Sequence, residues 1–210
     1  MNKKKYIIFI LITVLFVAGG AYLFVQRSHS SLQNEQYYSK TSYIEALHAF
    51  SLEHPELSEF TTLVDEEEAK IAAAPSNTEG YLSLGLAWKS LADRAGDPPN
   101  MFYEAAFEVY KRGIELTDRR DTTFLKNAAN MAEFQKDFDT SETLLQEAIV
   151  ATPGDADLYI RLADVYTYLM KKPTQEIIDF LDTGIEILPN ATRLENYKKR
   201  LETNEQSNNL

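Results

Sequence analysis

Apolar and small residues recur at helical spacing between residues 81 and 184. In three stretches they occupy positions i, i+3, i+4 and i+7, which lie on one face of an α-helix. These sets are Tyr81, Leu84, Gly85 and Trp88; Leu125, Ala128, Ala129 and Ala132; and Tyr159, Leu162, Ala163 and Tyr166. A second set follows each of them: Ala106, Tyr110 and Gly113; Ser141, Leu145 and Ala148; and Ile177, Leu181 and Gly184. The pattern predicts three pairs of amphipathic helices.

The pairs repeat along the chain with a nearly constant period. Leu125 and Tyr159 are 34 residues apart, whereas Tyr81 and Leu125 are 44 apart because of an insertion around residues 97–100. The last unit carries about two extra residues near Lys171-Lys172-Pro173. Pro153 and Pro189 end the second helix of their units, since proline cannot continue a helix. One pair cannot bury its apolar face alone, so we expect the units to stack.

This pattern resembles the tetratricopeptide repeat (TPR) family. The large–x2–Leu–small–x2–aromatic first helix, the second helix with small residues and the closing proline are visible over residues 78–189. Departures include Leu125 and Ala132 in place of aromatics, and Asp118 in place of a proline. The resemblance implies an all-α fold, a right-handed superhelix of helical hairpins, with repeats at residues 78–121, 122–155 and 156–189.

The segments that flank the repeats are also predicted to be helical. Residues 41–77 contain Tyr43, Ala46, Leu47 and Phe50 at helical spacing and are expected to form a degenerate helical pair. Residues 190–203 suit a terminal capping helix with a polar outer side. Residues 204–210 are expected to be a frayed tail.

The N-terminus has the features of a membrane anchor. Residues 1–5 include three lysines, and residues 6–25 form a run of 20 residues without a charge. As a helix this run would cover about 30 Å, the thickness of a bilayer core. The positive-inside rule places residues 1–5 in the cytoplasm and the bulk of the chain outside it. Residues 26–40 are polar and are expected to be a tether. A cleaved signal peptide is the alternative, because Ala18-Gly19-Gly20-Ala21 could be cut.

Composition narrows the classes of function. Lys3, Lys4, Lys5 and Arg27 precede the first acid, so removing these four cations from a net charge of −11 leaves −15 for the rest. Such a charge argues against nucleic-acid binding, which depends on Lys and Arg contacts to phosphate. There is no cysteine among the 210 residues, so disulfides, cysteine-ligated metals and thiol nucleophiles are excluded.

No motif indicates catalysis, a cofactor or a metal ion. Phosphate-binding glycine loops and nucleophile elbows are absent from the sequence. His48 and His54 are expected to be surface or partly buried histidines rather than ligands. The run Asp65-Glu66-Glu67-Glu68 is expected to be a solvated helix face, because consecutive helical residues point in different directions. Trp88, Tyr159 and Tyr166 are expected to belong to the core.

The resemblance implies that the first helices line a concave groove that binds a protein or peptide. Positions beside the core set would face it. The candidate groove residues are Leu82, Leu86, Lys89, Lys126, Asn130, Glu133, Ile160, Arg161 and Asp164; Glu79, Thr123, Asn127, Asp157 and Thr167 lie alongside. Lys126 and Asn130 partly match the carboxylate clamp of cytosolic co-chaperones in this family, although Arg161 stands where that clamp has Asn. Leu82, Leu86 and Ile160 predict a mixed groove with some apolar character.

Three functions are consistent with these features. The first is a membrane-anchored, extracytoplasmic scaffold for protein–protein interaction in the cell envelope. The second is a chaperone-like accessory factor of secretion or envelope assembly, which would bind many chains weakly. The third is a ligand-binding protein or enzyme whose site the sequence does not reveal, since a fold does not define a function.

Overall fold

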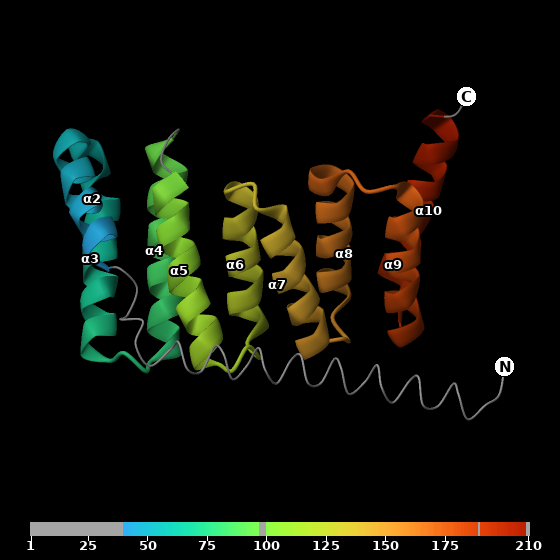
Figure 1. The fold of residues 1–210 in the computed structure, drawn as a ribbon, viewed down its shortest axis with the longest axis horizontal. Helices are drawn as coiled ribbons and strands as arrows, with labels where there is room; N and C mark the ends of the chain where they lie inside the picture. Colours follow the sequence, from blue (N-terminus) through green and yellow to red (C-terminus); the bar gives the residue numbers. More distant parts are fainter. Residues whose placement is uncertain (1–39, 97–99, 189, 209–210) are drawn as a thin grey trace, which may run out of the picture. The chain divides into compact units, whose positions relative to one another are not determined.

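The structure is a series of helical pairs that follow one another in chain order (Figure 1). It is a computed structural model and describes residues 40–96, 100–188 and 190–208. Within these ranges all regular secondary structure is helical, which confirms the all-α prediction. The α-helices are α2 (Lys40–Glu53), α3 (Ser58–Ala73), α4 (Thr78–Ala95), α5 (Asn100–Leu116), α6 (Thr122–Phe134), α7 (Phe138–Ala151), α8 (Ala156–Asp164), α9 (Thr174–Ile187) and α10 (Thr192–Asn208).

Short side chains begin the first helix of each repeat. Asn77, Asp121 and Asp155 each accept a hydrogen bond from the backbone N–H two residues on, at 3.2, 2.8 and 2.9 Å respectively. Such a cap satisfies an N–H group that has no partner inside the helix. The same kind of cap at α4, α6 and α8 marks the repeat at the level of the backbone.

The core consists of the residues that recur in the sequence. All twelve first-helix positions and all nine second-helix positions of the three repeats are buried. Two glycines allow consecutive helices to approach closely: Gly85 where α4 meets α5, and Gly113 where α5 meets α6. A Cβ atom on Gly85 would lie 2.3 Å from the Tyr110 ring, and one on Gly113 would lie 2.0 Å from the Phe124 ring. Close approach, rather than backbone freedom, explains glycine at these two positions.

Helix α2 joins two elements that are not consecutive in the chain. His48 on α2 lies 3.3 Å from Asp65 on α3, and the Phe50 ring stands edge-on to Phe102 of α5, with centroids 5.0 Å apart. Leu47, also on α2, has no exposed surface. Residues Ser42–Leu210 form one structural unit, separate from Met1–Thr41, and α2 holds its first part together.

The expectation that the acidic run Asp65–Glu68 is a solvated helix face was wrong in part. Asp65 and Glu66 are exposed, whereas Glu67 and Glu68 are buried, with 8% and 4% of their surface exposed. Helix α3 packs against α4, and its Asp65 contacts His48 of α2. Lys70 pairs with Glu67 at 2.6 Å. Helix α10 continues to Asn208, past the expected end at 203, because no proline or glycine interrupts it.

The loops absorb the irregularities of the repeat. Where a proline was missing, Asp118 and Arg119 take left-handed conformations, with φ of 51° and 59°, and Arg119 is held by Glu147 of α7 at 2.5 Å. The extra residues of the last unit are accommodated by a π-helical turn, Val165–Met170, which ends at Lys171 in a left-handed conformation. This turn keeps Tyr166 buried while Tyr168 is 63% exposed.

The predicted anchor, residues 6–25, lies outside the described residues, and so does the predicted tether, residues 26–40, except for Lys40 at the start of α2. In the part of the chain that is described, none of the helices combines the length and the apolar character that crossing a bilayer requires.

Candidate functional site

The candidate groove residues lie on the surface of the first helices. None of the nine is buried, so all can be reached from solvent. Four of them, Lys126, Ile160, Arg161 and Asp164, line one surface hollow of about 330 Å³ together with Asp157. We call it the α6–α8 hollow, because Lys126 belongs to α6 and the other four belong to α8.

Arg161 and Glu133 form the structural centre of this region. Arg161 donates to Glu133 at 2.5 Å and to the Asn130 side chain at 3.4 Å, and so joins α8 to α6. Glu133 also accepts from the fully buried Ser141 at 3.0 Å. Burial raises the pKa of Glu133, and the Arg161 guanidinium opposes that rise. Arg161 and Asn130 are therefore engaged with the protein itself, which disfavours the carboxylate clamp considered from the sequence.

The two aspartates of the α6–α8 hollow are held by α10. Asp157 forms an ion pair with Arg193. Asp164 accepts a hydrogen bond of 2.7 Å from the Tyr197 hydroxyl. Burial, with the Asp164 carboxylate adding to it, raises the pKa of Tyr197 to about 12, so the hydroxyl remains a donor at neutral pH. The contact of α10 with α8 thus resembles that of α8 with α6. In each case side chains of the later helix donate to carboxylates of the earlier one.

Lys126 differs from the other charged groups of the hollow. Its side chain is exposed and, within the described residues, makes neither a hydrogen bond nor an ion pair. Ile160 beside it is the only apolar residue of the lining, and it is partly exposed. The hollow therefore offers one cation without a partner next to one apolar contact, on a frame whose other charges are already paired.

The remaining candidates lie on α4, away from this hollow. Leu86 is 58% exposed. Lys89 pairs with Asp93 at 2.6 Å, and Asp93 also accepts from Tyr103 at 2.8 Å. The Tyr103 ring stacks on Phe134, with centroids 4.4 Å apart. Leu82, Leu86 and Lys89 therefore do not line the α6–α8 hollow, although the Lys89 ammonium lies 5.5 Å from the centre of the Phe134 ring at the end of α6.

Sequence reasoning missed the residues that α10 contributes. Tyr197 was expected on the apolar face of the capping helix, and neither its hydroxyl nor Arg193 was assigned a role. A signal was present, because Leu194, Tyr197 and Leu201 continue the spacing of the first helices and so place α10 next to α8.

No chemistry of a metal or a nucleophile emerges from the described part of the chain. There, groups of three or more His, Asp or Glu side chains that could hold a metal ion are not found. His48 and His54 lie at the surface next to Asp65 and Glu56, as expected.

Comparison with known proteins defines the class of fold. The sequence matches no protein-family model, and a search of curated proteins gave no match. Among solved structures the chain is similar to MamA, with a TM-score of 0.53 and 18% identity, over 73% of this chain and 83% of MamA. It is also similar to a thermophilic TPR protein of Thermus thermophilus, with a TM-score of 0.53 and 18% identity, over 90% of this chain and 95% of that one.

A double mutant of MamA gives a TM-score of 0.51 and 13% identity, over 78% and 85% of the two chains. The fold is thus that of a TPR-like helical repeat protein, as the sequence predicted. At these identities the likeness concerns the fold alone.

Proposed function

We propose that this protein is a membrane-anchored, extracytoplasmic scaffold that holds a protein partner in the α6–α8 hollow. The observation that carries the proposal is the unpaired Lys126 beside the exposed Ile160, within a frame of paired charges. A preformed frame lowers the cost of ordering side chains when a partner binds. The TPR-like fold supports a protein or peptide as the partner rather than a nucleic acid, and the net charge of −11 agrees with that choice.

The location rests on the N-terminal sequence. The uncharged run of residues 6–25 after three lysines supports a single-pass anchor with residues 1–5 in the cytoplasm. Resistance of the protein to carbonate extraction, with an intact N-terminus by mass spectrometry, is the expected result. Release of a shorter protein would mean that the segment is a cleaved signal peptide instead.

The binding role is tested by crosslinking the full-length protein in cells, followed by affinity capture and mass spectrometry. Lys126→Glu and Ile160→Asp are each expected to remove the main crosslinked protein. Lys111→Glu, which makes the same charge change on the exposed surface of α5, is the matched control and should leave it in place. Loss in all three variants, or in none, would refute the assignment to this hollow.

The same experiment separates the scaffold from its alternatives. One dominant envelope protein that depends on Lys126 and Ile160 supports a dedicated scaffold. Many exported chains in small amounts would support the chaperone-like role. We propose no enzymatic activity, since the described residues contain no arrangement for it; turnover of a small molecule that depends on the hollow would overturn that view.

A further inference from the structure

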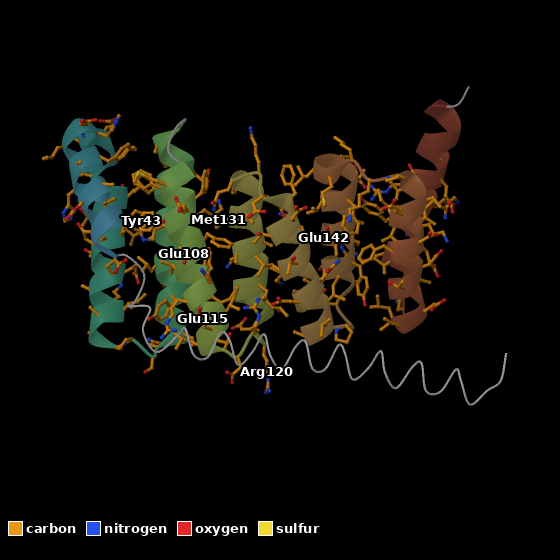
Figure 2. All side chains as sticks on the ribbon, in the orientation of Figure 1. Tyr43, Glu108, Glu115, Arg120, Met131 and Glu142 are labelled. Atoms are coloured by element: carbon orange, nitrogen blue, oxygen red, sulfur yellow. The ribbon has the colours of Figure 1, made fainter. Side chains whose placement is uncertain are left out.

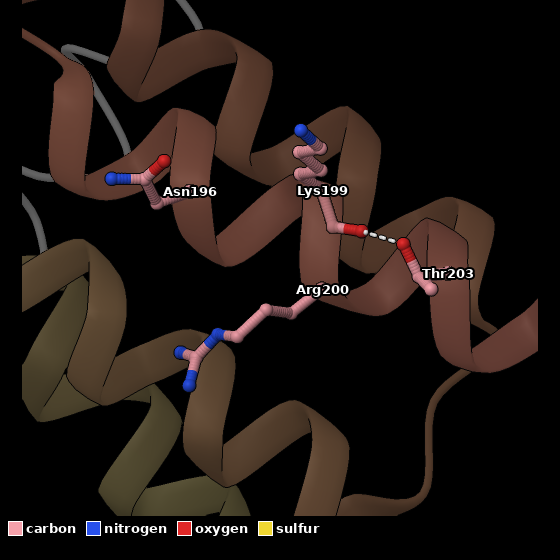
Figure 3. A pocket seen from close by; sticks show the side chains of 4 residues that line it. All are labelled: Asn196, Lys199, Arg200 and Thr203. Carbon is pink, nitrogen blue, oxygen red and sulfur yellow. Dashed lines mark hydrogen bonds between the residues drawn. The ribbon is translucent and has the colours of Figure 1, made fainter.

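A second surface hollow lies on the terminal helix. It has a volume of about 390 Å³ and is lined by Asn196, Lys199, Arg200 and Thr203, all on α10 (Figure 3). We call it the α10 hollow. These residues are spaced i, i+3, i+4 and i+7, so they share one face of the helix. The lining contains two cations and no carboxylate, in a chain whose net charge is −11.

The two cations of the α10 hollow have no acidic partner among the described residues. Neighbouring basic residues on α10 are paired: Arg193 with Asp157, and Lys198 with Asp182 at 2.7 Å. Lys199 and Arg200, in contrast, form no ion pair with any described residue. Arg200 is placed by packing, since its guanidinium lies 4.9 Å from the centre of the Tyr197 ring.

The two hollows adjoin through Tyr197. Its hydroxyl donates to Asp164, which lines the α6–α8 hollow, and its ring supports Arg200, which lines the α10 hollow. A chain leaving Ile160 and passing over α10 would therefore meet Arg200 and Lys199 next. Figure 3 shows these two side chains projecting from α10 in different directions. Cations that diverge suit several carboxylates along one chain better than one small anion.

We propose that the α10 hollow is a second subsite, which binds the carboxylates of an acidic polypeptide segment. The inference rests on the proposed partner-binding role and specifies the chemistry of that partner: an acidic stretch next to the part that contacts Lys126 and Ile160. An anionic bilayer is the less suitable occupant. A flat anionic surface that reached Lys199 and Arg200 would also approach the exposed Glu195 and Glu202 of the same helix, whereas a narrow extended chain can follow the cations alone.

The test uses the full-length protein in a nonionic detergent and a fluorescein-labelled deca-glutamate peptide, with binding read by fluorescence polarisation. The expected result is binding at low salt that weakens as ionic strength rises, because exposed charges are screened. The double variant Lys199→Glu, Arg200→Glu should weaken binding by about tenfold or more, given the size of exposed ion pairs and the reversal of charge. Lys111→Glu with Arg120→Glu makes the same charge change elsewhere and should have little effect.

The outcomes distinguish this subsite from the proposed groove. If Lys126→Glu abolishes peptide binding and the α10 variant does not, the groove stands and the α10 subsite is refuted. If the α10 variant weakens binding no more than its matched control, the subsite is likewise refuted. If glycerophosphoserine displaces the peptide where free glutamate at equal concentration does not, the hollow recognises a lipid headgroup and the proposal fails. Selective loss in the α10 variant, with no such displacement, supports it.

Discussion

The contact between Gly113 and Phe124 gives the sharpest test of how the repeats pack. Gly113 lies in α5, and Phe124, with no exposed surface, lies in α6. In Gly113→Ala the new methyl carbon would lie 2.0, 2.3 and 2.5 Å from three atoms of the ring. The shortest distance is about 1.4 Å inside the 3.4 Å at which ordinary contact begins. Because the ring is enclosed, it cannot retreat without moving its neighbours.

Two effects of this substitution oppose each other. Alanine favours a helix over glycine by about 1 kcal/mol. Overpacking a full core costs about 1–3 kcal/mol, and three close ring contacts place this case near the upper end. We therefore expect a net loss of about 2 kcal/mol in the free energy of unfolding. With a urea dependence of about 2 kcal/mol per molar, the midpoint should fall by about 1 M.

The assay is urea unfolding of the full chain in detergent, followed by circular dichroism and by the fluorescence of Trp88, the only tryptophan. Two probes are needed because repeat proteins can unfold unit by unit. Gly154→Ala is the matched control: nothing lies within 4 Å of its added carbon, so stability should rise by about 0.4–1 kcal/mol. A Gly113→Ala protein as stable as wild type would refute the packing. The packing would also be refuted if the stability changes of Gly113→Ala and Phe124→Leu simply added in the double variant, because substitutions of residues in contact are expected to be non-additive.

Three further predictions concern single residues. Burial raises the pKa of Glu133 in the folded state, so the stability of wild type relative to Glu133→Gln should be greatest below the unfolded pKa and should fall as pH rises through the folded pKa. Urea midpoints of both proteins at pH 4 and pH 7 would measure this difference, and a change of opposite sign would contradict the prediction. Lys136→Gly should stabilise the protein by about 0.5 kcal/mol, because Lys136 has a left-handed φ of 61° that glycine adopts more easily. The control Gln135→Gly, at a φ of −81°, should destabilise it by about 1 kcal/mol. Equal effects of the two substitutions on the thermal midpoint would argue against the left-handed turn. Asp155→Ala removes the cap that accepts from the Asp157 N–H and should cost about 1 kcal/mol, measured by urea unfolding with Asp155→Asn as the variant that retains it.

Local periodicity explains why the repeats could be predicted. Tyr81, Gly85 and Trp88 are buried because their spacing places them on one helix face, and that face has to be covered whatever the partner is. Figure 2 shows the side chains of the described residues on these helices. The stacking of similar pairs then follows from their shared pattern.

Contacts between elements without a shared pattern could not be predicted. The approach of Phe50 to Phe102 depends on how α2 crosses α3 and α5, and nothing local encodes that crossing. For the site, spacing identified which residues face outwards, but not that Arg161 reaches Glu133 and leaves Lys126 unpaired, since that depends on the length and direction of side chains. The two extra residues were visible, whereas their placement in the turn Val165–Met170 was not.

Because α10 is the last described helix of the array, ligand binding there is coupled to the local opening of this helix. Helices that contact neighbours on one side only open at a lower free energy than those in the middle. Helix α10 packs on α9, on α8 and on the turn Val165–Met170 that follows α8. A ligand that bridges α8 and α10 would therefore slow amide hydrogen exchange most at this end of the chain. The terminal turn of the array would then act as a reporter of occupancy, with protection rising from Thr192 onwards while α4 and α5 change little.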